Sequence, residues 1–78
     1  MARMVLLGPA REAAGTSVDI IEGESLDAVM DEAVRRYGPA FQKVLEVSRI
    51  WVNGEPAEPK SPIACDDEVA VLPPVSGG

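Results

Sequence analysis

The chain has 78 residues, 46% of them hydrophobic and 4% aromatic, and its 7 Lys and Arg against 13 Asp and Glu give a formal net charge of −6. This length and apolar content suit one small folded domain. The sequence contains no His and a single Cys, which excludes imidazole-based catalysis, His-ligated metals and an internal disulfide. The acidic charge disfavours nucleic acid, and the apolar run near the N-terminus is too short for a signal peptide or a membrane span. We therefore expect a cytoplasmic chain that binds no metal, nucleic acid or membrane and has no active site of its own.

Two strands and a short turn of helix are predicted before the main helix. Residues 3–8 predict a strand whose central side chains are apolar on both faces. Residues 10–14 predict a brief helical turn. A second strand is predicted at residues 17–21, where Val18 and Ile20 alternate with polar residues. That alternation has the period of a half-buried strand.

The main helix has the clearest local signature. Ser25 can cap its N-terminus, because the Ser hydroxyl accepts a hydrogen bond from a free amide of the first turn. We also expect ion pairs one turn apart, Asp31 with Arg35 and Glu32 with Arg36. A Gly-Pro pair ends the helix. Its apolar positions recur at helical spacing and form one stripe: Leu26, Val29, Met30, Ala33, Val34 and Tyr37.

The second half of the chain predicts a hairpin and a last strand. Residues 41–47 leave open whether they form a short helix. Residues 49–52 predict a strand that runs into Asn53-Gly54, a strong hairpin signal. The last strand is predicted at residues 68–72. The return strand of the hairpin must be short and lie at a sheet edge, because proline cannot donate to a ladder and three prolines follow: Pro56, Pro59 and Pro62.

These elements predict an α+β domain with one main helix packed on one face of a small mixed sheet. Residues 4–7 and 69–72 are apolar on both faces of their strands, yet one helix can cover only one face. The other face should therefore keep an exposed apolar surface, which in small proteins usually marks a partner site. Trp51 and Leu72 are the predicted anchors on this face. Trp51 could instead lie in the core, with its two neighbours in the strand facing outward.

Few side chains could carry chemistry. Cys65 is a possible nucleophile, but the sequence places no His or Lys beside it to activate its thiol, so we interpret it as an ordinary turn residue or a partly buried cysteine. The acidic residues 66–68 lack the spaced oxygen ligands of a calcium loop. We interpret them as a solvated turn.

The last six residues, 73–78, form a tail beyond the domain of residues 1–72. The paired prolines at its start favour a stiff, extended exit from the sheet. The two glycines at its end have no Cβ, so their backbone can pass through a narrow channel in a partner. Apart from Ser76 the tail has no reactive side chain. The reactive group that it offers is therefore the terminal carboxylate of Gly78.

The tail is the most specific part of a resemblance that covers essentially the whole chain. The ending DEVAVLPPVSGG (residues 67–78) closely resembles the C-terminus of the small subunit of molybdopterin synthase. The opening VLLGPAREAAG (residues 5–15) resembles the first strand and following loop of that family, and VNGE (residues 52–55) resembles its central hairpin. The resemblance implies a ubiquitin-like β-grasp sulfur carrier, and the paired prolines favour the molybdopterin branch over the thiamin branch. One departure is Cys65-Asp66, where the family usually has Asp-Gly; Asp66 could take a left-handed turn conformation only at a higher cost than Gly.

The resemblance also implies how the chain works. A separate E1-like adenylating enzyme would use ATP and Mg²⁺ to convert the Gly78 carboxylate to an acyl adenylate, and a persulfide sulfur donor would displace AMP to leave a thiocarboxylate. In the large subunit of molybdopterin synthase this sulfur would be donated to the molybdopterin precursor. The chain itself would bind no cofactor. Besides Gly78 it would contribute residues that bind partners: Trp51, Leu72, Pro73, Pro74, Val75, Ser76 and Gly77.

Other interpretations remain open. The chain could carry sulfur in another pathway, such as thiamin or cysteine synthesis, or it could be a ubiquitin-like modifier that forms isopeptide bonds. It could also be a β-grasp interaction module with an inert tail. The sequence does not separate the carriers from one another, because the destination of the sulfur depends on the partner.

Overall fold

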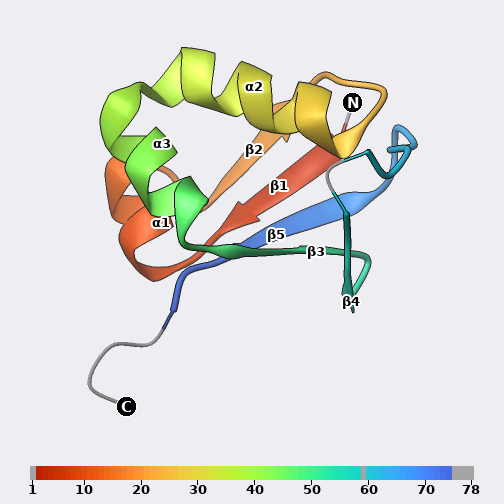
Figure 1. Cartoon of the computed structure of the whole chain (residues 1–78). Coiled ribbons are helices and arrows are strands. Elements are labelled where there is room, and N and C mark those ends of the chain that lie inside the picture. The colour runs from red at the N-terminus through yellow and green to blue at the C-terminus, as the bar shows by residue number, and fades with distance from the viewer. Residues whose placement is uncertain (1, 59, 75–78) are drawn as a thin grey trace.

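The computed structural model describes residues 2–58 and 60–74. The predicted strands and the main helix are confirmed, with ends within two residues of the predicted ones. The segment left open at residues 41–47 is helical, and the brief turn predicted at residues 10–14 is a longer helix. No helix in these two described ranges is long and apolar enough to cross a membrane. In chain order the elements are β1 (Ala2–Leu6), α1 (Gly8–Ala14), β2 (Val18–Ile21), α2 (Leu26–Tyr37), α3 (Pro39–Glu46), β3 (Arg49–Val52), β4 (Glu55–Pro56) and β5 (Glu68–Leu72) (Figure 1).

The strands form one five-stranded mixed sheet in the order β2-β1-β5-β3-β4. β1 runs antiparallel to β2 and parallel to β5, whereas β3 runs antiparallel to both β5 and β4. The predicted α+β fold with a mixed sheet is therefore confirmed. β4 is two residues long and lies at the edge, as its proline requires.

The hairpin between β3 and β4 turns through Asn53 and Gly54, which both have positive φ angles, 52° and 83°. Two successive residues with positive φ are what a tight two-residue hairpin needs, so the sequence signal is confirmed. Asn53 has a second role that the sequence did not reveal. Its side-chain amide donates to Asp67 Oδ1 at 2.9 Å, and its Oδ1 accepts from the Glu68 amide at 2.9 Å. Asn53 thus ties the hairpin to the start of β5.

The turn before β5 closes without the left-handed residue that the sequence led us to consider at Asp66. Asn53 is the non-glycine residue with positive φ in the described ranges. Instead, the Asp67 carboxylate accepts from the Ala64 amide at 2.8 Å, while the Asp67 amide donates to the Ala64 carbonyl at 3.1 Å. The Ala64 amide, and after it the Asn53 side chain, hold the pKa of Asp67 below its usual value.

α2 begins and ends as predicted. Ser25 is its N-cap, with the hydroxyl accepting from the Ala28 amide at 3.2 Å. The predicted pair between Glu32 and Arg36 is present at 3.4 Å. The predicted partner of Arg35 is wrong, however: its guanidinium binds Glu32 at 2.6 Å, three residues back, and not Asp31. One carboxylate therefore holds both arginines on this side of the helix.

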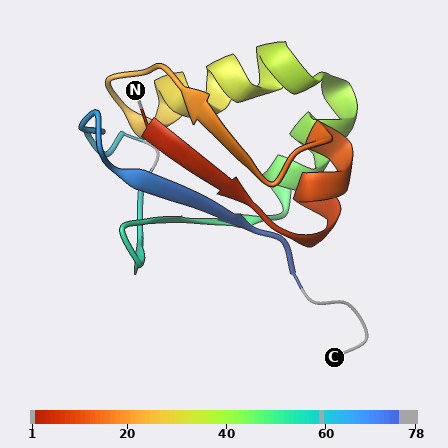
Figure 2. The same cartoon turned by 180° about the vertical axis from the view of Figure 1, so that it is seen from behind.

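All three helices pack against the same face of the sheet (Figures 1 and 2). α2 is the longest of them and presents the predicted stripe, whereas α1 and α3 each add one buried side chain, Ala10 and Phe41. Alternate residues of the strands point into the same core. The buried cluster comprises Ala2, Met4, Leu6, Ala10, Ile21, Leu26, Val29, Ala33, Phe41, Ile63, Val69 and Val71.

Candidate docking face and the root of the tail

The face of the sheet opposite the helices, which we call the outer face, remains uncovered by the helices, as the apolar strands predicted. Strand residues alternate between the two faces, and the register between strands shows which residues share this one. The outer face comprises Arg3, Val5, Val18, Ile20, Arg49, Trp51, Glu68, Ala70 and Leu72.

The middle of the outer face is apolar across four strands. The register aligns one residue from each strand in a single row: Val18, Val5, Ala70 and Trp51. On one side of this row, Ile20 pairs with Arg3, which in turn pairs with Glu68. On the other side, Leu72 pairs with Arg49. The result is an apolar band with basic and acidic groups beside it, which suits reversible docking of a protein with similar mixed character.

The two predicted anchors lie on this face. Ile50 and Val52 pack against the core, which places Trp51 between them on the opposite side of β3. Leu72 likewise alternates with the buried Val71. Both anchors are half-buried instead of fully exposed. That they bind a partner stays a prediction.

The most exposed apolar residues of the outer face are two that the sequence analysis did not select. Val18 and Ile20 of β2 are 40% and 49% exposed. Their alternation predicted a half-buried strand, in which the apolar side chains would ordinarily face the core. Here Ile21 takes the core position at the end of β2, and Asp19 faces α2, so the apolar pair faces outward. The sequence signal for this orientation was the pair Ile20-Ile21, because two successive apolar residues place one apolar side chain on each face of the strand.

The root of the tail lies at one end of the same sheet. β5 ends at Leu72, followed by Pro73, which is half-buried, and Pro74, which is exposed. Leu7 follows the end of β1, which runs parallel to β5, and is 47% exposed. Val47 precedes β3, the other neighbour of β5, and is 65% exposed. Exposed apolar side chains thus flank the point where the tail leaves the sheet.

The remaining tail residues, 75–78, lie outside the described part of the chain. The roles predicted for Val75, Ser76 and Gly77 in binding a partner, and for Gly78 as the reactive residue, therefore stay predictions. Pro73 and Pro74 are described, but nothing in the structure tests their predicted contacts with a partner.

Other candidate sites offer little chemistry. Cys65 is exposed in the turn before β5, so the prediction of a turn residue is confirmed and the alternative of a partly buried cysteine is wrong. Within residues 2–58 and 60–74, no group of three or more acidic or Cys side chains is placed to hold a metal ion. A groove of about 370 Å³ lies between α2 and the β3–β4 edge, lined mainly by apolar side chains such as Met30, Ile50 and Ala57. Its polar lining includes Asp27 and Ser48, but the Ser48 hydroxyl donates to the Val44 carbonyl at 2.6 Å and so serves the backbone.

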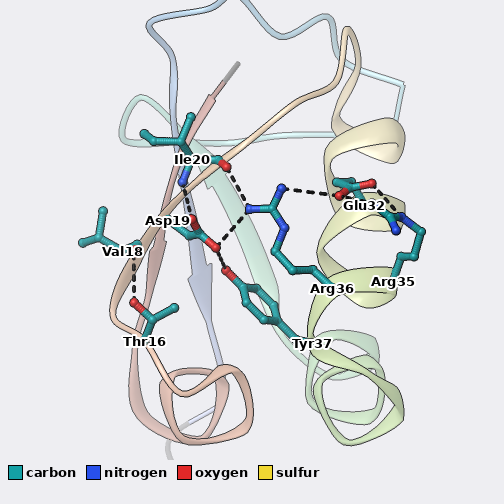
Figure 3. A network of polar contacts seen from close by, with 8 residues as sticks. All are labelled: Thr16, Val18, Asp19, Ile20, Glu32, Arg35, Arg36 and Tyr37. Carbon is teal, nitrogen blue, oxygen red and sulfur yellow. Dashed lines mark hydrogen bonds and ion pairs between the residues drawn. The ribbon is translucent and has the colours of Figure 1, made fainter.

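A polar network joins β2 to α2 on the helix side of the sheet (Figure 3). Asp19 accepts from the Tyr37 hydroxyl and from Arg36, whose Nη1 lies 3.1 Å from Asp19 Oδ2. The bond from Tyr37, with further ones from the Ile20 amide and Arg36, lowers the pKa of Asp19. Burial, reinforced by the Asp19 carboxylate, raises the pKa of Tyr37 to about 12. Asp19 therefore stays ionised and Tyr37 stays a hydroxyl donor at neutral pH.

Comparisons with known proteins agree with this architecture. The sequence profile of the ThiS family matches residues 4–78. Small archaeal modifier protein 1 (SAMP1) from Methanosarcina acetivorans is 27% identical, with a TM-score of 0.88 and coverage of 99% of this chain and 95% of that chain. No curated protein sequence matches the chain.

Two further solved structures show the same fold at lower identity. The BexX/CysO complex from Amycolatopsis orientalis contains a chain that is 16% identical, with a TM-score of 0.85 and full coverage of both chains. The complex of subunits 1 and 2 of molybdopterin-converting factor from Helicobacter pylori contains one that is 22% identical, with a TM-score of 0.72 and coverage of 99% and 97%. The ubiquitin-like β-grasp fold implied by the resemblance is thereby confirmed. With nearly its whole length matched by the family profile, the chain belongs to the ThiS family and is a ubiquitin-like sulfur carrier.

Proposed function

We propose that this chain carries sulfur as a thiocarboxylate on Gly78 and donates it in molybdopterin synthesis, as the small subunit of molybdopterin synthase. The observation that carries the proposal is the family match, which runs through residue 78 and so includes the whole tail. The paired prolines at the root of the tail, Pro73 and Pro74, support the molybdopterin branch. We propose that the chain acts in the cytoplasm.

The proposed chemistry uses one group of this chain. An E1-like enzyme joins the Gly78 carboxylate to AMP from MgATP and releases pyrophosphate, which gives the carboxyl carbon a good leaving group. The terminal sulfur of a persulfide displaces AMP, and a second thiol cleaves the resulting sulfur–sulfur bond to leave the thiocarboxylate. In the acceptor subunit this sulfur attacks the molybdopterin precursor. Water then hydrolyses the acyl intermediate and restores the carboxylate.

The outer face supports docking of large partners during these steps. The apolar row from Val18 to Trp51 ends near Leu72, the last residue of β5. A partner bound to this row would therefore receive the tail from a fixed direction. Structurally similar chains occur in complexes named for two proteins, BexX with CysO and subunit 1 with subunit 2 of molybdopterin-converting factor. We therefore expect this chain to act together with a partner protein, and we propose the activating enzyme and the large synthase subunit as its partners.

A second candidate function has its own support. SAMP1 from M. acetivorans, at 27% identity, is named as a modifier protein. The same Gly78 acyl adenylate that accepts sulfur could be attacked by a lysine amine, which would form an isopeptide bond. Sulfur carriage for thiamin or cysteine synthesis would also use the same adenylate. The alternatives therefore differ only in what attacks the activated carbon and where the product goes.

Reconstitution with the host's own proteins tests the molybdopterin proposal. Thiocarboxylated chain is mixed with the large synthase subunit and the molybdopterin precursor, and formation of the dithiolene product is followed. We expect one dithiolene for every two thiocarboxylates consumed, because a dithiolene contains two sulfur atoms. The chain lacking Gly78 is the matched control and should give no product.

The alternatives predict a different outcome. If the wild-type chain gives no dithiolene but becomes linked to lysine side chains in the presence of the activating enzyme and ATP, the modifier function is correct. If it gives neither product but delivers sulfur to a thiamin or cysteine precursor, the pathway assignment is wrong while the carrier function stands.

A further inference from the structure

β2 is an edge strand of the sheet, and half of its backbone polar groups point away from β1. The Leu6 amide donates to the Ser17 carbonyl at 2.9 Å, and Asp19 is aligned with Met4. Successive residues of a strand direct their amides and carbonyls to opposite sides. Val18 and Ile20 therefore present theirs to the free edge. Such an edge is a ready template for pairing with another strand.

Side chains from this molecule already occupy that edge (Figure 3). The Thr16 hydroxyl donates to the Val18 carbonyl at 2.9 Å. The Ile20 amide donates to Asp19 Oδ1 at 2.8 Å, and Arg36 Nη1 donates to the Ile20 carbonyl at 3.0 Å. An incoming strand would have to displace these bonds before it could form its own.

The cap on Ile20 is built into the packed structure. Arg36 is held from two directions, by Asp19 at 3.1 Å and by Glu32 at 3.4 Å. Asp19 is fixed in turn by the Tyr37 hydroxyl, and the Tyr37 ring packs edge-on against the buried Phe41 with 5.1 Å between ring centroids. The guanidinium is therefore positioned over the edge by contacts that reach the core.

The opposite edge of the sheet is closed by simpler means. β4 has only two residues, one of them Pro56, which has no amide to donate. Beyond it, the Ala57 amide donates to the Ile50 carbonyl at 3.1 Å. Of the two edge strands, β2 is therefore the one long enough to pair with another strand.

We propose that Thr16, Asp19 and Arg36 keep β2 closed, and that the partner they exclude is β2 of a second copy of this chain. Antiparallel pairing about a two-fold axis gives the donors of each copy the acceptors of the other. It would also bring Val18 and Ile20 of both copies side by side, so that the apolar band of the outer face would continue across the new edge. The cap therefore keeps the carrier monomeric.

The test opens the edge while leaving the core intact. The double variant Thr16→Val/Arg36→Met removes two of the capping donors and keeps similar side-chain volumes. The matched control is Thr16→Val/Arg35→Met, which has the same charge but loses an arginine that binds Glu32 and not β2. Sedimentation equilibrium over a range of concentrations, at an ionic strength that screens the net negative charge, measures self-association.

We expect the Arg36 variant to form dimers with an association constant at least about tenfold above that of the wild type and the control. Hydrogen exchange of its Val18 amide should slow as concentration rises, because that amide would enter the new ladder. Adding Ile20→Lys should restore the monomer, since it places two like charges close together across the two-fold axis.

Three results would overturn the proposal. The Arg36 variant could stay monomeric with a native circular-dichroism spectrum and a cooperative melt. The control could dimerise equally. Dimers could also form without protection of the Val18 amide. Should the double variant fail to fold, Arg36→Met alone carries the same test, because Arg36 is not part of the buried cluster and the substitution leaves that cluster untouched.

Discussion

Trp51 and Ile50 are neighbours in β3 whose side chains lie on opposite faces of the sheet. Ile50 packs against the core, whereas Trp51 lies in the apolar row of the outer face. Because the two residues are adjacent in the chain, substitutions at them separate a docking role from a structural one more cleanly than distant positions would.

Trp51→Ala should weaken binding to the activating enzyme while leaving folding nearly unchanged. A central aromatic anchor commonly contributes about 2 kcal/mol or more, which is roughly thirtyfold in affinity. Titration calorimetry measures the affinity, and thermal unfolding measures the stability. Ile50→Ala is the control, expected to lower stability by about 1–3 kcal/mol, less than a fully buried site because Ile50 is only half-buried. If Trp51→Ala unfolds as readily as Ile50→Ala, Trp51 belongs to the core.

At the scale of single elements, β2 depends on α2 for more than packing. Asp19 of β2 accepts hydrogen bonds from Tyr37 and Arg36 of α2, and these bonds lower its pKa. A carboxylate whose pKa is lower in the folded chain than in the unfolded chain stabilises the fold above its unfolded pKa. That contribution is lost as pH falls through the folded pKa.

Asp19→Asn should therefore flatten the acid side of the stability profile. The free energy of unfolding of the wild type should fall steadily below about pH 4, where carboxylates take up protons. The variant should be less stable at neutral pH and lose less on acidification. Glu32 and Asp67, whose pKa values are also lowered, should leave part of the slope in place. Urea unfolding at a series of pH values measures this, and parallel curves for the two proteins would contradict it.

How far the sequence determines each element can be seen from α2 and β2. The cap at Ser25 and the apolar stripe of α2 are local patterns, and both were predicted correctly. The direction in which β2 faces was not predicted, because it depends on its pairing with β1 and on a bond between Asp19 and Tyr37, which are 18 residues apart. Likewise, the fold places Leu7 and Val47 beside the root of the tail through the β1–β5 and β3–β5 pairings, which no short window of sequence contains.

At the scale of the whole molecule, the helices and the proposed docking surface are on opposite sides of one sheet. The helices cover one face, and the outer face ends where β5 leads into the tail (Figure 2). The position of the outer face beside the start of the tail has a consequence for the proposed partners. Two proteins that both dock on the outer face to reach the tail would occupy the same surface.

The activating enzyme and the sulfur acceptor should consequently compete for the chain. We expect a labelled chain bound to the activating enzyme to be released on titration with the large synthase subunit, with no ternary complex by size-exclusion chromatography. Ile20→Lys, in the outer face, should weaken both complexes, whereas Arg35→Met, on α2 and away from that face, should affect neither. A stable complex of all three proteins would show that the two partners use different surfaces.

The central claim, that this chain carries sulfur on its last residue, is tested most directly by intact mass spectrometry. The chain is incubated with its activating enzyme, MgATP, a persulfide donor and a thiol. The wild type and Cys65→Ser should both gain the mass difference between sulfur and oxygen, and the fragment that carries the gain should contain Gly78. The chain lacking Gly78 should gain nothing while melting at nearly the wild-type temperature, since β5 ends at Leu72. Conversion of the truncated chain, or loss of conversion in Cys65→Ser, would contradict the claim.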